Sequence, residues 1–168
     1  MLLILKSIGK TDITQLYRVY EQTLSSLNKR THCLGDRQLF SQMEFYEGLQ
    51  CFYAQKDSFC AIWAPDGRYE AALRIEPYRD GFLISWLETA MEARRKGYAT
   101  MLLSHTISYL NTLYASPVYS HVEKTNIPSL KVHLNNGFNR VSESAVFLDG
   151  SVFNTHCTLV YDNKKPAP

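Results

Sequence analysis

Hydrophobic and polar positions along the chain change period several times, which predicts a mixture of strands and helices. Alternating or short apolar runs predict strands, and apolar residues at helical spacing predict helices. The predicted strands are Leu2–Lys6, Ser58–Trp63, Tyr69–Glu76, Phe82–Thr89, Val118–Lys124, Ala145–Leu148 and Val152–Tyr161. The predicted helices are Asp12–Leu24, Asp36–Ala54, a segment after Gly97 and a segment after Asn126, with Ser25–Gly35 as a loop.

The most informative segment is the passage from the strand that ends at Thr89 into the helix that follows Gly97. Its turn reads Arg94-Arg95-Lys96-Gly97-Tyr98-Ala99, and the helix behind it carries an apolar stripe as far as Leu113. The first amide groups of a helix lack intrahelical acceptors and lie at the positive end of the helix dipole. A glycine that lets an anion approach and three adjacent cations therefore predict a phosphate or pyrophosphate site here.

Two common phosphate motifs do not fit this segment. A P-loop needs Gly-Lys followed by Ser or Thr, whereas Lys96 precedes Gly97 in this chain. A dinucleotide-binding turn needs three spaced glycines and an acidic residue suited to a ribose after a second strand, and neither is present at this place. The site is therefore predicted to hold phosphate in another way.

A second pattern lies downstream, from Asn126 to Phe138. Asn126 is placed to cap a helix that tolerates Pro128 in its first turn, and Asn136-Gly137 is placed to end that helix. Phe138 then returns the chain to the predicted sheet.

Together, the two segments resemble the two signatures of the GNAT superfamily of acyl-CoA-dependent N-acetyltransferases. The first is Arg94-x-x-Gly97-x-Ala99 after a strand, and the second is Asn126, Ser129, His133 and Gly137-Phe138 in order. The resemblance implies an α/β (α+β) fold with a central mixed, mostly antiparallel sheet, one splayed pair of strands and about four flanking helices. It also implies one domain over residues 1–162, with residues 163–168 as a loose tail.

The resemblance further implies acetyl-CoA as co-substrate. Residues 94–99 would wrap its pyrophosphate, mainly through backbone N–H groups, with side-chain charge from Arg94 or Arg95. The strand end Leu87–Thr89 would bind the pantetheine arm and polarise the thioester carbonyl, and Asn126 would bind the same arm besides capping its helix. The complete predicted cofactor-binding set is Leu87, Glu88, Thr89, Arg94, Arg95, Lys96, Gly97, Tyr98, Ala99, Thr100, Asn126 and Ser129.

The predicted proton donor departs from the family pattern. Seven residues after the asparagine the family commonly has a tyrosine that acts as the acid, and this chain has His133. A histidine with a near-neutral pKa can protonate the departing sulfur. The alternative interpretation is a histidine that packs on a helix face or points to solvent.

The predicted proton acceptor is left open among three residues. His121, on the strand before Asn126, is the first candidate, followed by Glu88 and then Glu123. Water alone is a further alternative. Glu70 and Glu76 are interpreted as solvated strand residues.

Composition narrows the class of protein. A chain of 168 residues with 45% apolar residues fits one globular domain, and a net charge of +2 does not favour nucleic acid as the main partner. Cys33, Cys51, Cys60 and Cys157 lack the paired spacing of a zinc site. We therefore expect free thiols, no metal and a cytoplasmic protein. The apolar start is too short for a signal peptide, and no stretch is long enough to span a membrane.

The resemblance implies an N-acetyltransferase that moves an acetyl group from acetyl-CoA directly to a primary amine. The alternatives are a non-catalytic acyl-CoA-binding sensor or interaction domain, and a phosphate- or nucleotide-binding protein of another fold. The sequence does not specify the acceptor. Aromatic residues such as Tyr46, Phe52 and Tyr53 either form an amine pocket by cation–π contact or pack the core. Family analogy leaves a homodimer open.

Overall fold

The computed structural model describes residues 1–28 and 37–162. Asp12 caps the first helix as predicted, because its side chain accepts the N–H of Gln15 at 3.0 Å. The first half of the chain forms β1 (Leu2–Leu5), η1 (Ile8–Lys10), α1 (Ile13–Asn28), α2 (Arg37–Ala54), β2 (Phe59–Trp63), β3 (Ala71–Tyr78) and β4 (Gly81–Thr89). The second half forms η2 (Met91–Ala93), α3 (Tyr98–Leu113), β5 (Val118–Glu123), α4 (Ile127–Asn135), β6 (Asn139–Ser142), β7 (Ala145–Val146), β8 (Val152–Phe153) and β9 (His156–Tyr161).

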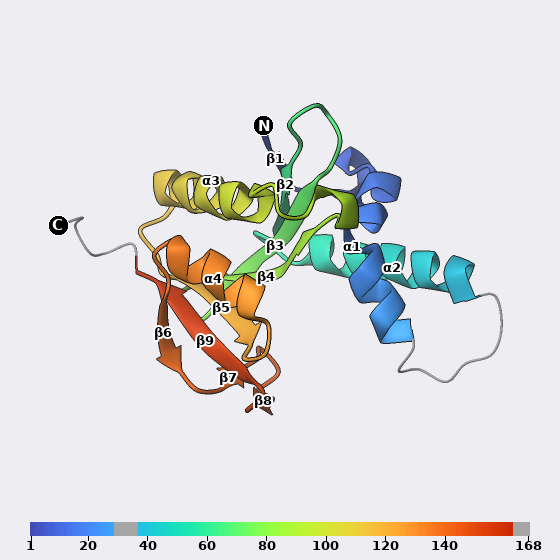
Figure 1. Ribbon diagram of the computed structural model, residues 1–168. Coiled ribbons are helices and arrows are strands. Elements are labelled where there is room, and N and C mark those ends of the chain that lie inside the picture. Colours follow the sequence, from blue (N-terminus) through green and yellow to red (C-terminus); the bar gives the residue numbers. More distant parts are fainter. Residues whose placement is uncertain (29–36, 163–168) are drawn as a thin grey trace.

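A seven-stranded sheet of order β1-β2-β3-β4-β5-β9-β6 forms the centre of the molecule. Its neighbouring strands are antiparallel except β4 and β5, which run parallel. Helices α3 and α4 cover one face of the sheet, and α1 and α2 cover part of the other (Figure 1). The predicted mixed, mostly antiparallel sheet with four flanking helices is confirmed.

Each face of the sheet has its own apolar core. The stripe of α3 (Leu102, Leu103, Ile107 and Leu110) packs with Leu73 and Ile84 on one face. On the other face Leu16 and Tyr20 of α1 and Leu49 of α2 pack with Ile62. Alternate strand residues supply the two cores, so the central strands are buried on both faces. The packing of α3 on one of these faces fixes the direction of its N-terminus relative to the sheet.

The two parallel strands part soon after they meet. β4 and β5 pair only over Phe82–Ile84 and Val118–Ser120, although both strands continue beyond this point. The pairing starts at a close approach, since a Cβ on Gly81 would lie 1.9 Å from the carbonyl oxygen of Pro117. The expected splayed pair is therefore present, and within residues 1–28 and 37–162 the edge of β4 that faces β5 has no strand partner from Ser85 onward.

A β-bulge lies in β4 just past the point where the strands part. Trp86 and Leu87 lie opposite the single residue Leu73, between the pairs Arg74–Ser85 and Ala72–Glu88. Trp86 adopts a φ of 53°, which is rare for a bulky residue and costs backbone strain. The bulge re-aims the last residues of β4.

Several predicted boundaries in the C-terminal part are wrong. The predicted strand Val152–Tyr161 is two strands, β8 and β9, because a turn at Asn154-Thr155 interrupts it, with the Thr155 carbonyl accepting the N–H of Lys124. Ala145–Leu148 shortens to β7, which pairs with β8 in a separate small sheet. Strand β6 was not predicted, since all four of its side chains are exposed and give no apolar alternation.

In the N-terminal half, α1 continues to Asn28, so the beginning of the predicted loop Ser25–Gly35 is helical. The rest of that loop lies outside the described residues, as does the tail 163–168. The predicted strand Tyr69–Glu76 shifts to Ala71–Tyr78. Within residues 1–28 and 37–162, no helix has the length and apolar character needed to cross a membrane.

Candidate functional site

A cleft of about 680 Å³ opens where β4 leaves β5. The end of β4, the turn before α3 and the first turns of α3 and α4 form its walls, and Gln22 and Thr23 of α1 also line it. Every predicted cofactor-binding residue lines it except Lys96. Residues that lie up to 42 positions apart in the sequence are therefore brought to one surface, as the predicted roles require.

The turn before α3 presents a row of unused backbone donors to this cleft. Arg95 and Gly97 have φ values of 62° and 80°, and Gly97 is the N-cap of α3 without a side-chain cap. Among the described residues, the amide N–H groups of residues 95–100 find no acceptor, and the first bond of the helix runs from Met101 to Gly97. Left-handed residues alternating along a turn aim successive N–H groups at one point, which forms an anion site.

Gly97 meets two requirements of this turn. Its positive φ is a conformation that other residues adopt only with strain, and a Cβ at this position would meet no protein atom within 4 Å. A side chain here would therefore project into space that the protein leaves open. An anion bound at the helix terminus would need that space.

The three cations of the turn are not equivalent. The side chain of Arg94 is held at the strand end, where it donates to the Glu88 carboxylate at 2.9 Å and to the Thr89 carbonyl at 3.3 Å. Arg95 and Lys96 are exposed, and neither forms an ion pair within the described part of the chain. Free positive charge therefore comes from Arg95 and Lys96, whereas Arg94 anchors the turn.

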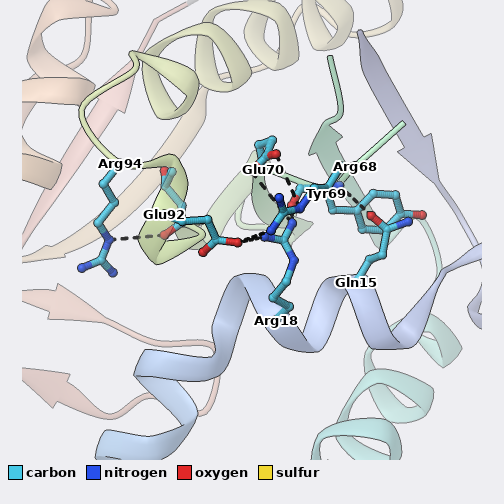
Figure 2. A network of polar contacts seen from close by, with 8 residues as sticks. Gln15, Arg18, Arg68, Tyr69, Glu70, Glu92 and Arg94 are labelled. Atoms are coloured by element: carbon cyan, nitrogen blue, oxygen red, sulfur yellow. Dashed lines mark hydrogen bonds and ion pairs between the residues drawn. The ribbon is translucent and has the colours of Figure 1, made fainter. Parts of the chain in front are cut away.

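An ion-pair network fixes the start of the turn from the α1 side. Glu92 of η2 accepts hydrogen bonds from Arg18 of α1 and from Arg68 of the β2–β3 turn, and both arginines also lie within 4 Å of Glu70 (Figure 2). The backbone N–H of Glu92 itself, followed by the two guanidinium groups, holds the pKa of the Glu92 carboxyl below its usual range. Since η2 leads directly into the basic turn, the network restrains the anion site.

The N-terminus of α4 forms the opposite wall. The side chain of Asn126 accepts the N–H of Ser129 at 3.1 Å, which confirms its predicted capping role. Its amide nitrogen stays available, because Asn126 is exposed and lines the cleft. Gly137, with a φ of 86°, ends the helix region as predicted, and Phe138 returns to the core.

His133 lies in the core between α4 and the sheet and not on the cleft wall. It is 1% exposed and its ring packs edge-on against Phe138. Its Nδ1 lies 2.8 Å from the carbonyl oxygen of Ser129, so Nδ1 is the protonated nitrogen, and the buried Nε2 is an acceptor with no partner in the described residues. Burial lowers the pKa of His133 despite this bond, so the neutral form is favoured. This geometry is that of a packed histidine.

His121 faces the other side of the sheet. Its Nδ1 donates to the Thr158 hydroxyl at 3.2 Å, and its ring contacts Tyr78 and Phe147. Burial lowers the pKa of His121, as do the charges of Arg79 and His156, while the Val146 carbonyl raises it. Glu123 lies exposed at the end of β5. Neither His121 nor Glu123 lines the cleft.

Glu88 does line the cleft, but both of its carboxylate oxygens are engaged. One accepts from Arg94 and the other from the Thr23 hydroxyl at 2.6 Å. These two bonds hold the Glu88 side chain between the basic turn and α1. The structure thus places Glu88 in the wall of the cleft, where it positions the side chains of Arg94 and Thr23.

The interpretation of Glu70 and Glu76 as solvated residues is wrong. Glu70 is largely buried within the ion-pair network. Glu76 is partly buried on the α1/α2 face of β3, where Ser85 donates to it at 3.2 Å, and burial raises the pKa of its carboxyl. Ser85 is the first β4 residue beyond the last pair with β5. Sequence reasoning missed Glu76 because alternation along β3 cannot show that Ser85 of the neighbouring strand bonds its carboxylate.

Two parallel strands that part in front of the N-terminus of a helix thus form a cleft with a strand edge on one side and free helix N–H groups on the other. The chain belongs to the GNAT family of acetyltransferases: the family described as "Acetyltransferase (GNAT) family" matches residues 15–138. No curated protein matches the chain in sequence.

Solved structures share the fold at low sequence identity. The ribosomal-protein-S18-alanine N-acetyltransferase from Escherichia coli has 16% identity and a TM-score of 0.64 over 99% of this chain and 97% of that one. The PaiA N-acetyltransferase from Thermoplasma acidophilum, solved with coenzyme A, has 11% identity and a TM-score of 0.68 over 96% and 99%. The ribosomal-protein-alanine N-acetyltransferase from Brucella melitensis has 16% identity and a TM-score of 0.67 over 95% and 99%.

Proposed function

We propose that the protein is an N-acetyltransferase that moves the acetyl group of acetyl-CoA directly to a primary amine. One observation carries the proposal: the unused N–H groups of residues 95–100 and the unpaired edge of β4 line the same cleft. The first feature suits a pyrophosphate and the second suits an extended amide-containing arm. The family supports acetyl transfer in general.

In this proposal the pyrophosphate of acetyl-CoA binds the backbone N–H groups of residues 95–100, with Arg95 and Lys96 adding charge. The pantetheine arm lies along Leu87–Thr89 and hydrogen-bonds their free main-chain groups, with Asn126 and Ser129 on the opposite wall. The thioester then lies where the strands part. A main-chain N–H there polarises its carbonyl and stabilises the tetrahedral oxyanion.

The acceptor amine attacks the thioester carbon from the α1/α2 face of the sheet. A C–N bond forms, the C–S bond breaks, and coenzyme A leaves as a thiolate that takes up a proton. The amine loses one proton, and we propose Glu76 as its acceptor, because its carboxyl is partly buried beside Ser85 at the opening of the strands. His121, which also lies on this face, is the second candidate. Glu88 is occupied by Arg94 and Thr23.

A second function is favoured by one observation. The position that commonly holds the tyrosine acid is the buried His133, which suits a non-catalytic acyl-CoA-binding domain. The two functions differ in turnover. Acetyl-CoA-dependent thiol release should be followed across a panel of amines, together with the melting temperature with and without acetyl-CoA. Stabilisation with thiol release supports the transferase, stabilisation without release for any amine supports the binding domain, and stabilisation by ATP alone contradicts both.

A further inference from the structure

Arg74 is a charged side chain inside the core. It lies on β3 and is 8% exposed, and no other Lys, Arg, Asp or Glu of the described residues is as deeply buried. Four aromatic rings surround its guanidinium carbon, with Trp86 at 4.4 Å, Phe52 at 5.3 Å, and Tyr20 and Phe45 at 5.8 Å. We call these four rings and Arg74 the arginine cage.

The cage holds a positive charge without a counter-ion. Within the described residues, no carboxylate lies within 4 Å of the Arg74 guanidinium, and its buried Nε makes no hydrogen bond. Glu76 is close enough to feel its charge, but it bonds Ser85 instead. Rings stabilise the faces of a guanidinium and leave the N–H groups on its edge unpaired. A buried cation in this state costs free energy that an apolar residue of similar size would not.

The position of the cage relative to the strand opening suggests what the charge is for. Arg74 pairs across the sheet with Ser85, the first β4 residue past the last β4–β5 pair, and its side chain lies on the α1/α2 face. Trp86, which covers the guanidinium, sits in the strained bulge and is 39% exposed. Trp86 directly precedes Leu87, the first β4 residue that lines the cleft, so the cage lies next to the cleft on the α1/α2 face, from which the amine would arrive.

We propose that Arg74 binds a carboxylate of the acceptor, so that the acceptor is an amine that also carries a carboxylate group. This inference rests on the proposed acetyltransferase function. One guanidinium presents a planar pair of N–H donors that matches one carboxylate, and its single charge balances one negative charge. A phosphate dianion would call for a second cation, and among the residues that the structure describes no other Lys or Arg lies over these rings.

The test compares aminocarboxylates from glycine to 6-aminohexanoate with their carboxamides, and includes phosphoethanolamine. Thiol release from acetyl-CoA is measured for the wild type, Arg74→Gln and Arg74→Lys, with Lys10→Gln as a control that removes an exposed charge. We expect the wild type to favour the carboxylates by at least about tenfold in kcat/KM. Arg74→Gln should lose that preference by slowing the carboxylates alone, and Arg74→Lys should keep part of it.

A binding measurement covers the case in which none of these amines is acetylated. Titration of the same compounds, in the presence of coenzyme A, should give a saturable change in tryptophan fluorescence for carboxylates, absent in Arg74→Gln and in Trp86→Phe. Arg74→Met replaces Arg74→Gln if the latter does not fold. Equal responses to acids and amides, an equal loss for both in Arg74→Gln, or a preference for phosphoethanolamine would overturn the proposal. Lack of stabilisation by acetyl-CoA would instead refute the acetyltransferase function, whatever the carboxylate response.

Discussion

The guanidinium of Arg94 donates to the carboxylate of Glu88 at 2.9 Å, and both residues line the cleft. This pair joins the last strand residues before the turn to the first residue of the basic turn itself. Thr23 of α1 bonds the other carboxylate oxygen, so three separate segments meet at one side chain. Glu88 therefore orders the site, and Arg94 is directed at the protein rather than at a ligand.

Glu88→Gln should change acetyl-CoA affinity slightly and leave the chemical step intact. The amide keeps an acceptor for Arg94 but loses the charge, and a partly exposed ion pair contributes only about 0–1 kcal/mol. We expect KM for acetyl-CoA to rise by less than about fivefold with kcat nearly unchanged. Steady-state kinetics at saturating amine measure both quantities. A loss in kcat of about 10²-fold or more, removed at high pH, would mark Glu88 as the base.

Gly97→Ala should weaken coenzyme A binding beyond its effect on stability. The new Cβ adds strain at a φ of 80° and projects into the space that we assign to the pyrophosphate. Gly67→Ala is a matched control, because Gly67 has a φ of 78° and open space around it but lies in the β2–β3 turn. Both variants should lose about 1 kcal/mol of unfolding free energy. Calorimetric titration should show weaker coenzyme A binding for Gly97→Ala only.

Glu76→Gln should remove the ascending limb of the pH–rate profile. Burial raises the pKa of Glu76, so the wild-type carboxyl becomes a base only as the pH rises through that value, and kcat/KM should increase with pH over this range. Loss of a general base slows reactions by roughly 10²–10⁴-fold. Ser85→Ala, which removes the hydrogen bond to Glu76, should shift the limb to higher pH and keep it. An unchanged pH–rate profile in Glu76→Gln would mean that His121 or water, and not Glu76, accepts the proton of the amine.

The raised pKa of Glu76 also predicts a stability effect. In the pH range between the unfolded and folded pKa values, the native state binds the proton more tightly than the unfolded chain does. Unfolding free energy should therefore fall as the pH rises through this range, and the fall should be smaller in Glu76→Gln. Thermal unfolding between acid and neutral pH measures the difference. A steeper fall of the unfolding free energy with pH in Glu76→Gln would contradict the partly buried environment assigned to Glu76.

His133→Phe separates the two roles considered for this residue. Burial lowers the pKa of His133 below its usual 6.5, so the neutral folded form loses stability as the pH falls below that value, and the variant should lose this part of the acid sensitivity. Since His133 does not line the cleft, we expect the substitution to change the free energy of unfolding more than it changes kcat. A large fall in kcat with unchanged acetyl-CoA affinity would restore the proton-donor role.

Much of the fold and of the cofactor side was predictable from local pattern. The turn at Arg94–Ala99 and the cap at Asn126 are short-range features, because the residues that form them lie within a few positions of each other. The elements that were misplaced, such as β6 and the break before β9, have exposed side chains or depend on a turn that contacts a distant strand. Alternation within one segment does not report such contacts.

The acceptor side was the least predictable. The arginine cage and the bond from Ser85 to Glu76 both join residues on neighbouring strands, and their effects arise from burial by helices far away in sequence. The surroundings of His133 were not predictable for the same reason: its position in the motif suggested chemistry, but the sequence does not show that Phe138 packs against its ring. Charge state depends on surroundings that only the folded chain supplies.

The central claim, that the cleft holds acetyl-CoA by its pyrophosphate at residues 95–100, is tested most directly by calorimetric titration with acetyl-CoA and with S-acetylpantetheine. The second compound has the same thioester and arm but lacks the pyrophosphate and the adenosine 3′-phosphate that the pyrophosphate carries. Several charge-assisted hydrogen bonds should make acetyl-CoA bind at least about a hundredfold more tightly. Equal affinity for the two compounds, or no binding of acetyl-CoA, would contradict the claim.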